Sequence, residues 1–347
     1  MLFWIFFIIL MFLCFAPIKV GYIKNTKLRR YIGIFIIVFI TIFRFDVGFD
    51  YEGYYHNLYP YFNYQSYERM EPMAKLFMNI SAHLKSPAVF FILFGLITLG
   101  CISYAIIKQS QSIFLSIFYY LAFYFLPGLS IIRQEAAIGI FLLAYCYVVK
   151  RKFTTYVILC IIASLFHTSA IITLLFYPFF NIKSRKLLIA ITISTIISLA
   201  IIMNLLLLIP IFASYYHYVE DSQGFQGGSI IRFITLGICI FTLLVSWKKK
   251  DIEILRIASL GLIGCYFTIL LGGHIGGRIA EYFTILLCIG VPNLCYRYYK
   301  RYIKAIGISL GIFFIANIYI STKNPNKTPY TPYQFIFLID TKTPQFR

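Results

Sequence analysis

The chain has 347 residues, of which 61% are hydrophobic and only 12% are charged. Soluble domains carry about twice that share of charged residues, so the composition excludes a soluble globular protein. The net charge of +19 would suggest nucleic acid as the partner of a soluble protein. Here most lysines and arginines lie in short clusters between apolar runs, a pattern typical of membrane orientation, and no nucleic-acid partner is expected.

Ten apolar segments have the length and composition of membrane spans. They are 1–18, 31–43, 87–107, 112–127, 131–149, 187–209, 229–247, 252–271, 279–296 and 303–320. A further long apolar run occupies 153–180. The sequence therefore predicts an all-α polytopic integral membrane protein of about 10–12 transmembrane or re-entrant helices, with residues 1–347 forming a single membrane domain.

Six basic clusters flank these segments and contain 20 of the 31 lysines and arginines. They are Lys19–Arg30, Lys108, Lys150–Lys152, Lys183–Lys186, Lys248–Arg256 and Arg297–Lys304. All of them should lie on the cytoplasmic side. A single crossing by 153–180 would place the later clusters outside, whereas a re-entrant hairpin with its tip at His167 keeps every cluster inside. The alternative is a miscount of the spans.

The hairpin topology places both termini on the outer side of the membrane. The outer loop 44–86, with an amphipathic segment, and the C-terminal tail 321–347 then lie outside as well. Most acidic residues share that face, so the polar chemistry should be there.

The first polar candidate is RFDVGFDYEGYY, which leaves the second span for the outer loop. Its members with binding or acid–base chemistry are Arg44, Asp46, Asp50, Tyr51 and Tyr54. If the segment is helical, Asp50 and Tyr54 lie on one face. A solvated loop with interfacial tyrosines would have the same composition.

Arg133, Gln134 and Glu135 open an apolar segment that is long enough to cross the bilayer. An arginine near a helix end can extend its charged group to the interface. Three adjacent residues spread over about 200° of a helix, however, so at least one of them must face the protein interior. An intramembrane charge is costly and is commonly functional.

His167 lies in the middle of the longest apolar run. A lone histidine there can be a simple hydrogen-bonding residue between helices. Imidazole also exchanges protons near neutral pH, which suits general acid–base chemistry.

The segment GGHIGGRIAEYF at 272–283 crowds four glycines around His274, followed by Arg278 and Glu281. A flexible turn with an internal ion pair is one interpretation. The other is close backbone approach to an anionic ligand, with Arg278 and Arg232 adding positive charge. Guanidinium groups suit phosphate or pyrophosphate, and a pyrophosphate at a membrane indicates a polyprenyl-linked glycan.

Five motifs in this order resemble the EpsG-like branch of the Wzy-type bacterial polysaccharide polymerases. They are RFDVGFDYEGYY, EPMAKLFMNI at 71–80, IIRQEAAIGIFLLAYCYVVKRK at 131–152, ASLFHTSAII at 163–172 and GGRIAEYF at 276–283. A Pro-Tyr pair near the end, Pro329–Tyr330 or Pro332–Tyr333, completes the pattern.

The resemblance implies a glycosyltransferase with a GT-C-like bundle that joins undecaprenyl-diphosphate-linked repeat units and requires no metal and no cofactor. It implies that Arg133, Arg278 and Arg44 hold the donor diphosphate. The base is then His167 or one of Asp46, Asp50 and Glu281, and we favour His167. Partners would be the lipid-linked donor and acceptor, membrane lipids and, as a further partner to test, a chain-length regulator.

Two other functions compete with polymerisation. A GT-C enzyme transferring one sugar from a polyprenyl monophosphate would also place acidic residues in the first outer loop. A flippase for lipid-linked glycans would need polar groups in both leaflets and commonly contains internal repeats. The sequence has no repeat and no buried charge in the cytoplasmic half.

Overall fold

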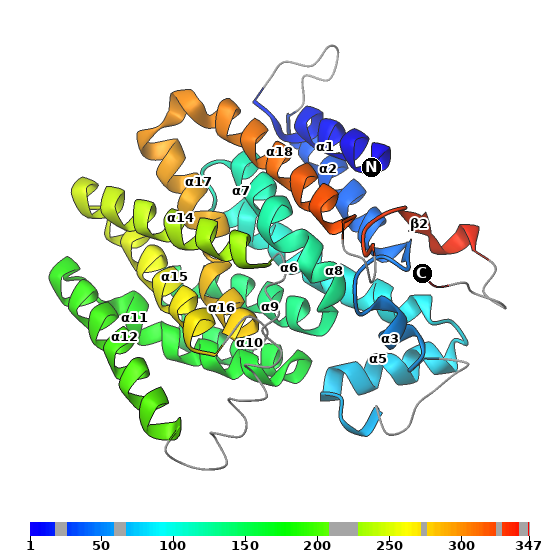
Figure 1. Cartoon of the computed structure of the whole chain (residues 1–347), viewed down its shortest axis with the longest axis horizontal. Helices are drawn as coiled ribbons and strands as arrows, with labels where there is room; N and C mark the ends of the chain where they lie inside the picture. The colour runs from blue at the N-terminus through cyan, green and yellow to red at the C-terminus, as the bar shows by residue number, and fades with distance from the viewer. Residues whose placement is uncertain are drawn as a thin grey trace. The chain divides into compact units, whose positions relative to one another are not determined.

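The computed structural model describes residues 1–17, 26–58, 67–207, 228–271, 276–323, 328–339 and 346 (Figure 1). The chain divides into two compact units. The first contains Met1–Ile171 and Lys300–Arg347, and the second contains Ile172–Tyr299.

A helix or helical pair occupies each of the ten predicted spans. The helices are α1 (Leu2–Phe15), α2 (Thr26–Ile42), α6 (Ala88–Gln109), α7 (Ile113–Tyr120) with α8 (Leu126–Ser130), α9 (Ile132–Val149), α12 (Arg185–Leu207), α14 (Gly228–Lys249), α15 (Ile252–Leu270), α16 (Gly277–Thr284) with α17 (Leu287–Tyr298), and α18 (Ile303–Ser321). In the described part of the chain, seven helical segments are long and apolar enough to cross a membrane, or eight with the bent α16–α17 pair. The all-α polytopic membrane prediction is confirmed.

In the first unit, α9 packs between α6 and α10 (Phe153–Phe166). The helix α5 (Pro72–His83) packs on α6 and α10, and it belongs to the outer loop predicted at 44–86. Its apolar face includes Phe77, whose ring contacts those of Phe94 on α6 and Phe166 on α10. The segment 44–86 is therefore fastened through α5 to α6 and to α10, the helix that ends beside His167.

The segment that leads into α9 is helical over most of its length. After α7 the chain forms a π-helix, η1 (Leu121–Phe125), and stays helical through Ser130. The backbone leaves helical geometry at Ile131, with φ −88° and ψ 51°, and α9 starts at Ile132. Asn317 of α18 donates a 3.1 Å hydrogen bond to the carbonyl of Ala122, a polar contact at the π-helix. The break places Arg133, Gln134 and Glu135 in the first turn of α9.

Residues 328–339, which we call the C-terminal strap, pack against the chain that leaves α2. Strand β2 (Gln334–Phe335) pairs antiparallel with β1 (Arg44–Phe45). The Gly48 amide donates to the Pro329 carbonyl at 2.7 Å, and the Trp4 indole donates to the Tyr330 carbonyl at 2.7 Å. A short 3₁₀ turn, η5 (Ile336–Leu338), follows β2. The C-terminal strap thus contacts both α1 and the β1 segment.

Within the predicted hairpin 153–180, α10 ends at Phe166 and His167 is extended, with φ −154° and ψ 120°. A 3₁₀ helix, η2 (Thr168–Leu175), and α11 (Phe176–Asn181) follow. The backbone therefore breaks at the residue predicted for the tip. The re-entrant course of the segment stays a prediction.

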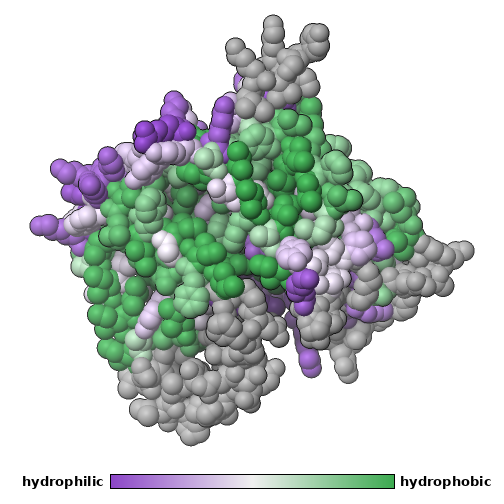
Figure 2. Space-filling view, turned by 45° about the horizontal axis from the view of Figure 1, so that its top comes forward, coloured by the Kyte–Doolittle hydropathy of each residue, from purple (hydrophilic) through white to green (hydrophobic). Residues whose placement is uncertain are grey.

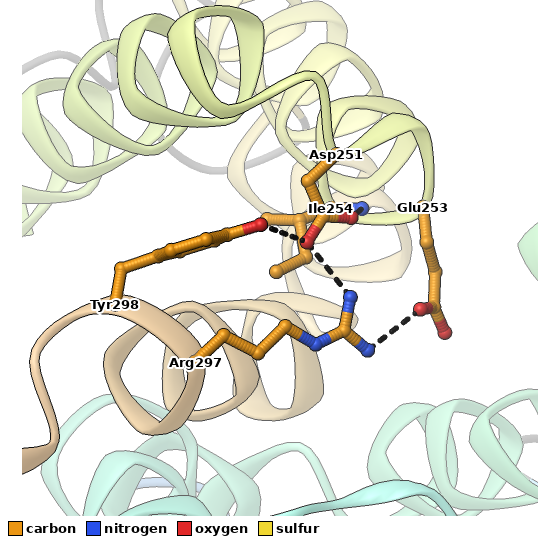
Figure 3. Close-up of polar contacts among 5 residues, drawn as sticks. All are labelled: Asp251, Glu253, Ile254, Arg297 and Tyr298. Carbon is orange, nitrogen blue, oxygen red and sulfur yellow. Dashed lines mark hydrogen bonds and ion pairs between the residues drawn. The ribbon is translucent and has the colours of Figure 1, made fainter.

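In the second unit, α15 packs against α12, α14, α16 and α17. The turn between α14 and α15 is fastened to the end of α17 by charged side chains: Arg297 contacts Asp251 and Glu253, and Tyr298 donates to Asp251 (Figure 3). Only 11% of the residues in Arg185–Ile202 of α12 and 17% of those in an 18-residue stretch of Ile230–Lys249 of α14 are buried. Hydrophobic side chains dominate the surface in Figure 2, as expected for contact with lipid.

Candidate functional site

Arg133 is the centre of a polar cluster in the first unit. Its Nη1 forms an ion pair and hydrogen bond with Oε2 of Glu71. Its Nε donates to the Tyr54 hydroxyl at 3.3 Å, and its guanidinium lies 5.7 Å from the centroid of the Tyr54 ring. Within the described residues, Nη2 has no hydrogen-bond partner, so the fork retains donors for an anionic ligand.

Glu71 is the site residue that the sequence analysis missed. It is the N-cap residue of α5, yet its side chain makes no capping hydrogen bond. Instead Oε2 pairs with Arg133, while Oε1 lies 3.8 Å from Nδ1 of His167. The available signal was Glu71–Pro72 at the start of an apolar helix, together with the need of a membrane arginine for an acidic partner.

His167 contacts Glu71 from the break between α10 and η2. Nδ1 also lies 3.2 Å from the hydroxyl of Ser169. One carboxylate therefore contacts both Arg133 and His167, two residues selected independently from the sequence. A histidine whose Nδ1 is oriented by neighbours can use Nε2 for proton transfer, which is the logic of a catalytic triad.

A cavity of about 470 Å³ lies beside this cluster. It is lined by Phe49, Asp50, Gly53, Tyr54, Asn57, Arg69, Met70 and Arg133. The predicted helix is present as α3 (Tyr51–Tyr55), with Asp50 at its N-cap and the Tyr54 amide bonded to the Asp50 carbonyl at 3.0 Å. Asp50, Tyr54 and Arg133 thus share one cavity.

Arg44 does not line this cavity. Its guanidinium donates to the backbone carbonyls of Thr41, Val47 and Leu129, and its side chain is fully enclosed. Removal from water lowers the pKa of this guanidinium from its ordinary value. These contacts support the backbone between α2 and α3, and we leave Arg44 out of the proposed diphosphate site.

Asp46 and Tyr51 are buried beside Arg44. Asp46 has a positive φ of 46°. The Tyr51 hydroxyl donates to the Arg44 carbonyl at 3.2 Å, and its ring stacks on Phe91 with 4.2 Å between centroids. Burial raises the pKa of Tyr51. Gln134 is likewise buried in the first turn of α9, and these three residues also lie outside the cavity lining.

The second unit brings together Arg232 of α14 with Arg278 and Glu281 of α16. Both arginines interact electrostatically with the Glu281 carboxylate. The start of α16 lies so close to α15 that a Cβ on Gly276 would be 2.3 Å from the Phe267 carbonyl oxygen. Gly276 therefore permits this close contact, and His274 lies outside the described residues. Among the described residues, no three His, Cys, Asp or Glu side chains are grouped to hold a metal ion.

Comparison with known proteins gives one family. The model of the EpsG family matches residues 27–335. No curated protein and no solved structure matches the chain. The matched range contains every residue of the Arg133 cluster.

Proposed function

The chain belongs to the EpsG family, and from that premise we propose that it is a polysaccharide polymerase. The substrates would be undecaprenyl-diphosphate-linked oligosaccharide repeat units. The enzyme would work at the outer face of the bacterial inner membrane, with both termini on that side.

The observation that carries this proposal is the position of Arg133. It stands in the first turn of a membrane helix, beside a cavity, and it shares Glu71 with His167. A guanidinium with donors to spare is suited to bidentate phosphate contact. A histidine beside it supplies acid–base chemistry.

In the proposed reaction, a hydroxyl at the non-reducing end of the acceptor unit attacks the anomeric carbon of the donor glycan. A carbon–oxygen glycosidic bond forms, and the bond from the anomeric carbon to the diphosphate oxygen breaks. The leaving group is undecaprenyl diphosphate. Arg133 would stabilise the negative charge that develops on it, an electrostatic contribution.

His167 would take the proton of the attacking hydroxyl at Nε2. Glu71 would orient the ring through Nδ1 and stabilise the imidazolium that forms, as the carboxylate of a catalytic triad does. Asp50, which lines the cavity, is the competing base. An imidazole base gives an acid limb of the rate profile near neutral pH, whereas a carboxylate base gives one several pH units lower.

Polymerisation needs two lipid diphosphates at once, one on the donor and one on the acceptor. The described residues contain two arginine sites: Arg133 with Glu71 and His167 in the first unit, and Arg232 and Arg278 with Glu281 in the second. We assign Arg232 and Arg278 to the diphosphate of the other substrate, in place of the shared donor site that the resemblance implied for Arg133 and Arg278. A transferase that uses one polyprenyl monophosphate would need one such cluster.

The test is a gel of the surface glycan after deletion of the gene. A polymerase mutant should collapse the ladder to a single-repeat band, because repeat units are still made, exported and ligated. Loss of all glycan with lipid-linked units retained inside would instead indicate a flippase. An intact ladder with one sugar missing from each repeat would indicate a single-sugar transferase.

Complementation of the deletion with Arg133→Ala and with Arg278→Ala extends the test to the residues. Both variants should reach the membrane and leave the single-repeat band. Normal chain length with either variant would contradict the role of that arginine in diphosphate binding.

A further inference from the structure

One part of the cavity is not used by the diphosphate chemistry. Phe49, at the cavity wall, exposes 44% of its surface. Its amide donates to the Ser130 hydroxyl at 2.9 Å, and its ring lies at 81° to the ring of Tyr330, with 6.1 Å between centroids. An apolar ring is therefore held in place from two sides and yet remains accessible.

Polar groups line the same cavity. Asn57 donates from Nδ2 to the Gly53 carbonyl at 2.5 Å, which orients its amide and leaves the amide oxygen as an acceptor. Asp50 adds a carboxylate and Arg69 adds guanidinium donors. The lining thus combines one aromatic face with both donors and acceptors.

The geometry points to a sugar-binding subsite in this cavity, with Phe49 as the stacking surface for a pyranose ring and Asp50, Asn57 and Arg69 as partners of its hydroxyls. The inference rests on the proposed function, because the ligand is taken to be the glycan of a lipid-linked repeat unit. The weakly positive C–H groups of a pyranose face suit the negative face of an aromatic ring. A volume of about 470 Å³ falls in the range typical of small-molecule sites.

The experiment measures binding of the free repeat-unit oligosaccharide to the purified full chain in nanodiscs. The oligosaccharide is obtained by mild acid release from the lipid-linked units of cells that lack the gene. Because it carries no diphosphate, it probes the sugar contacts alone. Phe49→Leu should weaken binding by about tenfold, since it keeps the apolar volume and removes the planar face.

Two matched variants complete the design. Phe49→Tyr keeps the ring and should bind within about twofold of the wild type. Phe6→Leu removes a more exposed ring from α1, where Phe6 is 69% exposed, and should leave binding unchanged.

Equal binding by Phe49→Leu and the wild type would overturn the subsite, as would a wild-type chain that does not bind the oligosaccharide. If Phe49 contacts lipid instead, leucine will serve as well as phenylalanine, which is the same overturning result. Should Phe49→Leu not fold, Asn57→Ala tests the same subsite and should weaken binding. The proposed function fails separately, when the wild type does not extend intact lipid-linked units.

Discussion

Two charged clusters among the described residues each contain an arginine, a glutamate and a tyrosine, but their carboxylates make different contacts. In one, Arg297 pairs with Asp251 at 2.7 Å and with Glu253 at 2.9 Å (Figure 3). In the other, Arg133 pairs with Glu71, which also contacts His167. Both clusters contain a tyrosine hydroxyl bonded to a charged group.

The difference lies in what the N-cap carboxylate does. Asp251 is the N-cap of α15, and its Oδ1 accepts the Ile254 amide at 3.3 Å, so the cluster completes a helix end. Glu71 is the N-cap of α5 and makes no such bond, and glutamate is not among the residues that commonly cap helices. Its carboxylate instead contacts an arginine and a histidine beside a cavity. Charge pairing alone would not have distinguished the two clusters.

The largest difference in the rate of chain extension is expected between variants of Arg133 and Arg297. Arg133→Ala should lower the rate of chain extension by about a hundred- to a thousandfold, because it removes a group that stabilises transition-state charge. Arg297→Ala should keep the rate and lower the free energy of unfolding by about 1 kcal/mol or less, as expected for a partly exposed pair. Extension of extracted lipid-linked units by purified protein measures the rate. Equal losses in the two variants would show that the clusters do not differ.

The histidines provide the next test. His167→Asn should lower the rate by about a hundredfold or more, in line with the loss of a general base. His56, exposed and 3.5 Å from Glu52, is the matched control, and His56→Asn should leave the rate unchanged. The pH dependence of the rate is the second readout. A wild-type acid limb far below neutral pH would assign the proton transfer to a carboxylate such as Asp50.

The two N-cap acids give a smaller effect. Glu71→Gln should lower kcat by about tenfold with little change in KM, because the amide keeps the shape of the side chain but cannot stabilise a neighbouring imidazolium. Asp251→Asn should keep kcat and change only thermal stability. Steady-state kinetics beside melting curves in detergent separate the two outcomes. A Glu71→Gln variant with lower Tm and normal kcat would make Glu71 a structural residue.

The smallest difference in rate is expected between variants of Tyr54 and Tyr51. Tyr54→Phe removes the hydroxyl that accepts from Arg133 and should lower the rate by about three- to tenfold, the value of one hydrogen bond. Tyr51→Phe removes the bond to the Arg44 carbonyl and should cost about 1 kcal/mol of stability without affecting the rate. The same kinetic and melting measurements apply. A rate loss in Tyr51→Phe alone would contradict the division between cavity residues and supporting residues.

The helices could be predicted because a membrane span is recognised from one contiguous apolar segment of the sequence. Each of the ten segments predicted from hydropathy contains a helix or helical pair, and seven or eight of the described helical segments are long and apolar enough to cross a membrane. The backbone of the apolar run around His167 breaks after Phe166. The β1–β2 pairing could not be predicted, since each strand has two residues and their partners are almost 300 positions apart. Hydrophobic periodicity carries no information about such a pair.

For the site, the sequence identified the charged residues but not their partners. Arg44 and Arg133 both lie at the ends of predicted spans. The Arg44 guanidinium donates to three backbone carbonyls, whereas Arg133 lines a cavity. Glu71 was missed because its role depends on contacts with residues 62 and 96 positions away. The sequence indicated a diphosphate as the partner of Arg133, and it did not indicate that Glu71 pairs with this arginine as well.

The C-terminal strap has a consequence for how the protein matures. Gly48 is bonded to Pro329, and a Cβ on Gly48 would lie 2.4 Å from the Leu129 carbonyl oxygen, so the segment that carries Phe49 and Asp50 is fixed between α8 and the strap. Residues 328–339 are synthesised after the described helices α1 to α18. The cavity wall can therefore take its final form only after residues 328–339 have left the ribosome, and a partly inserted chain would lack the finished cavity.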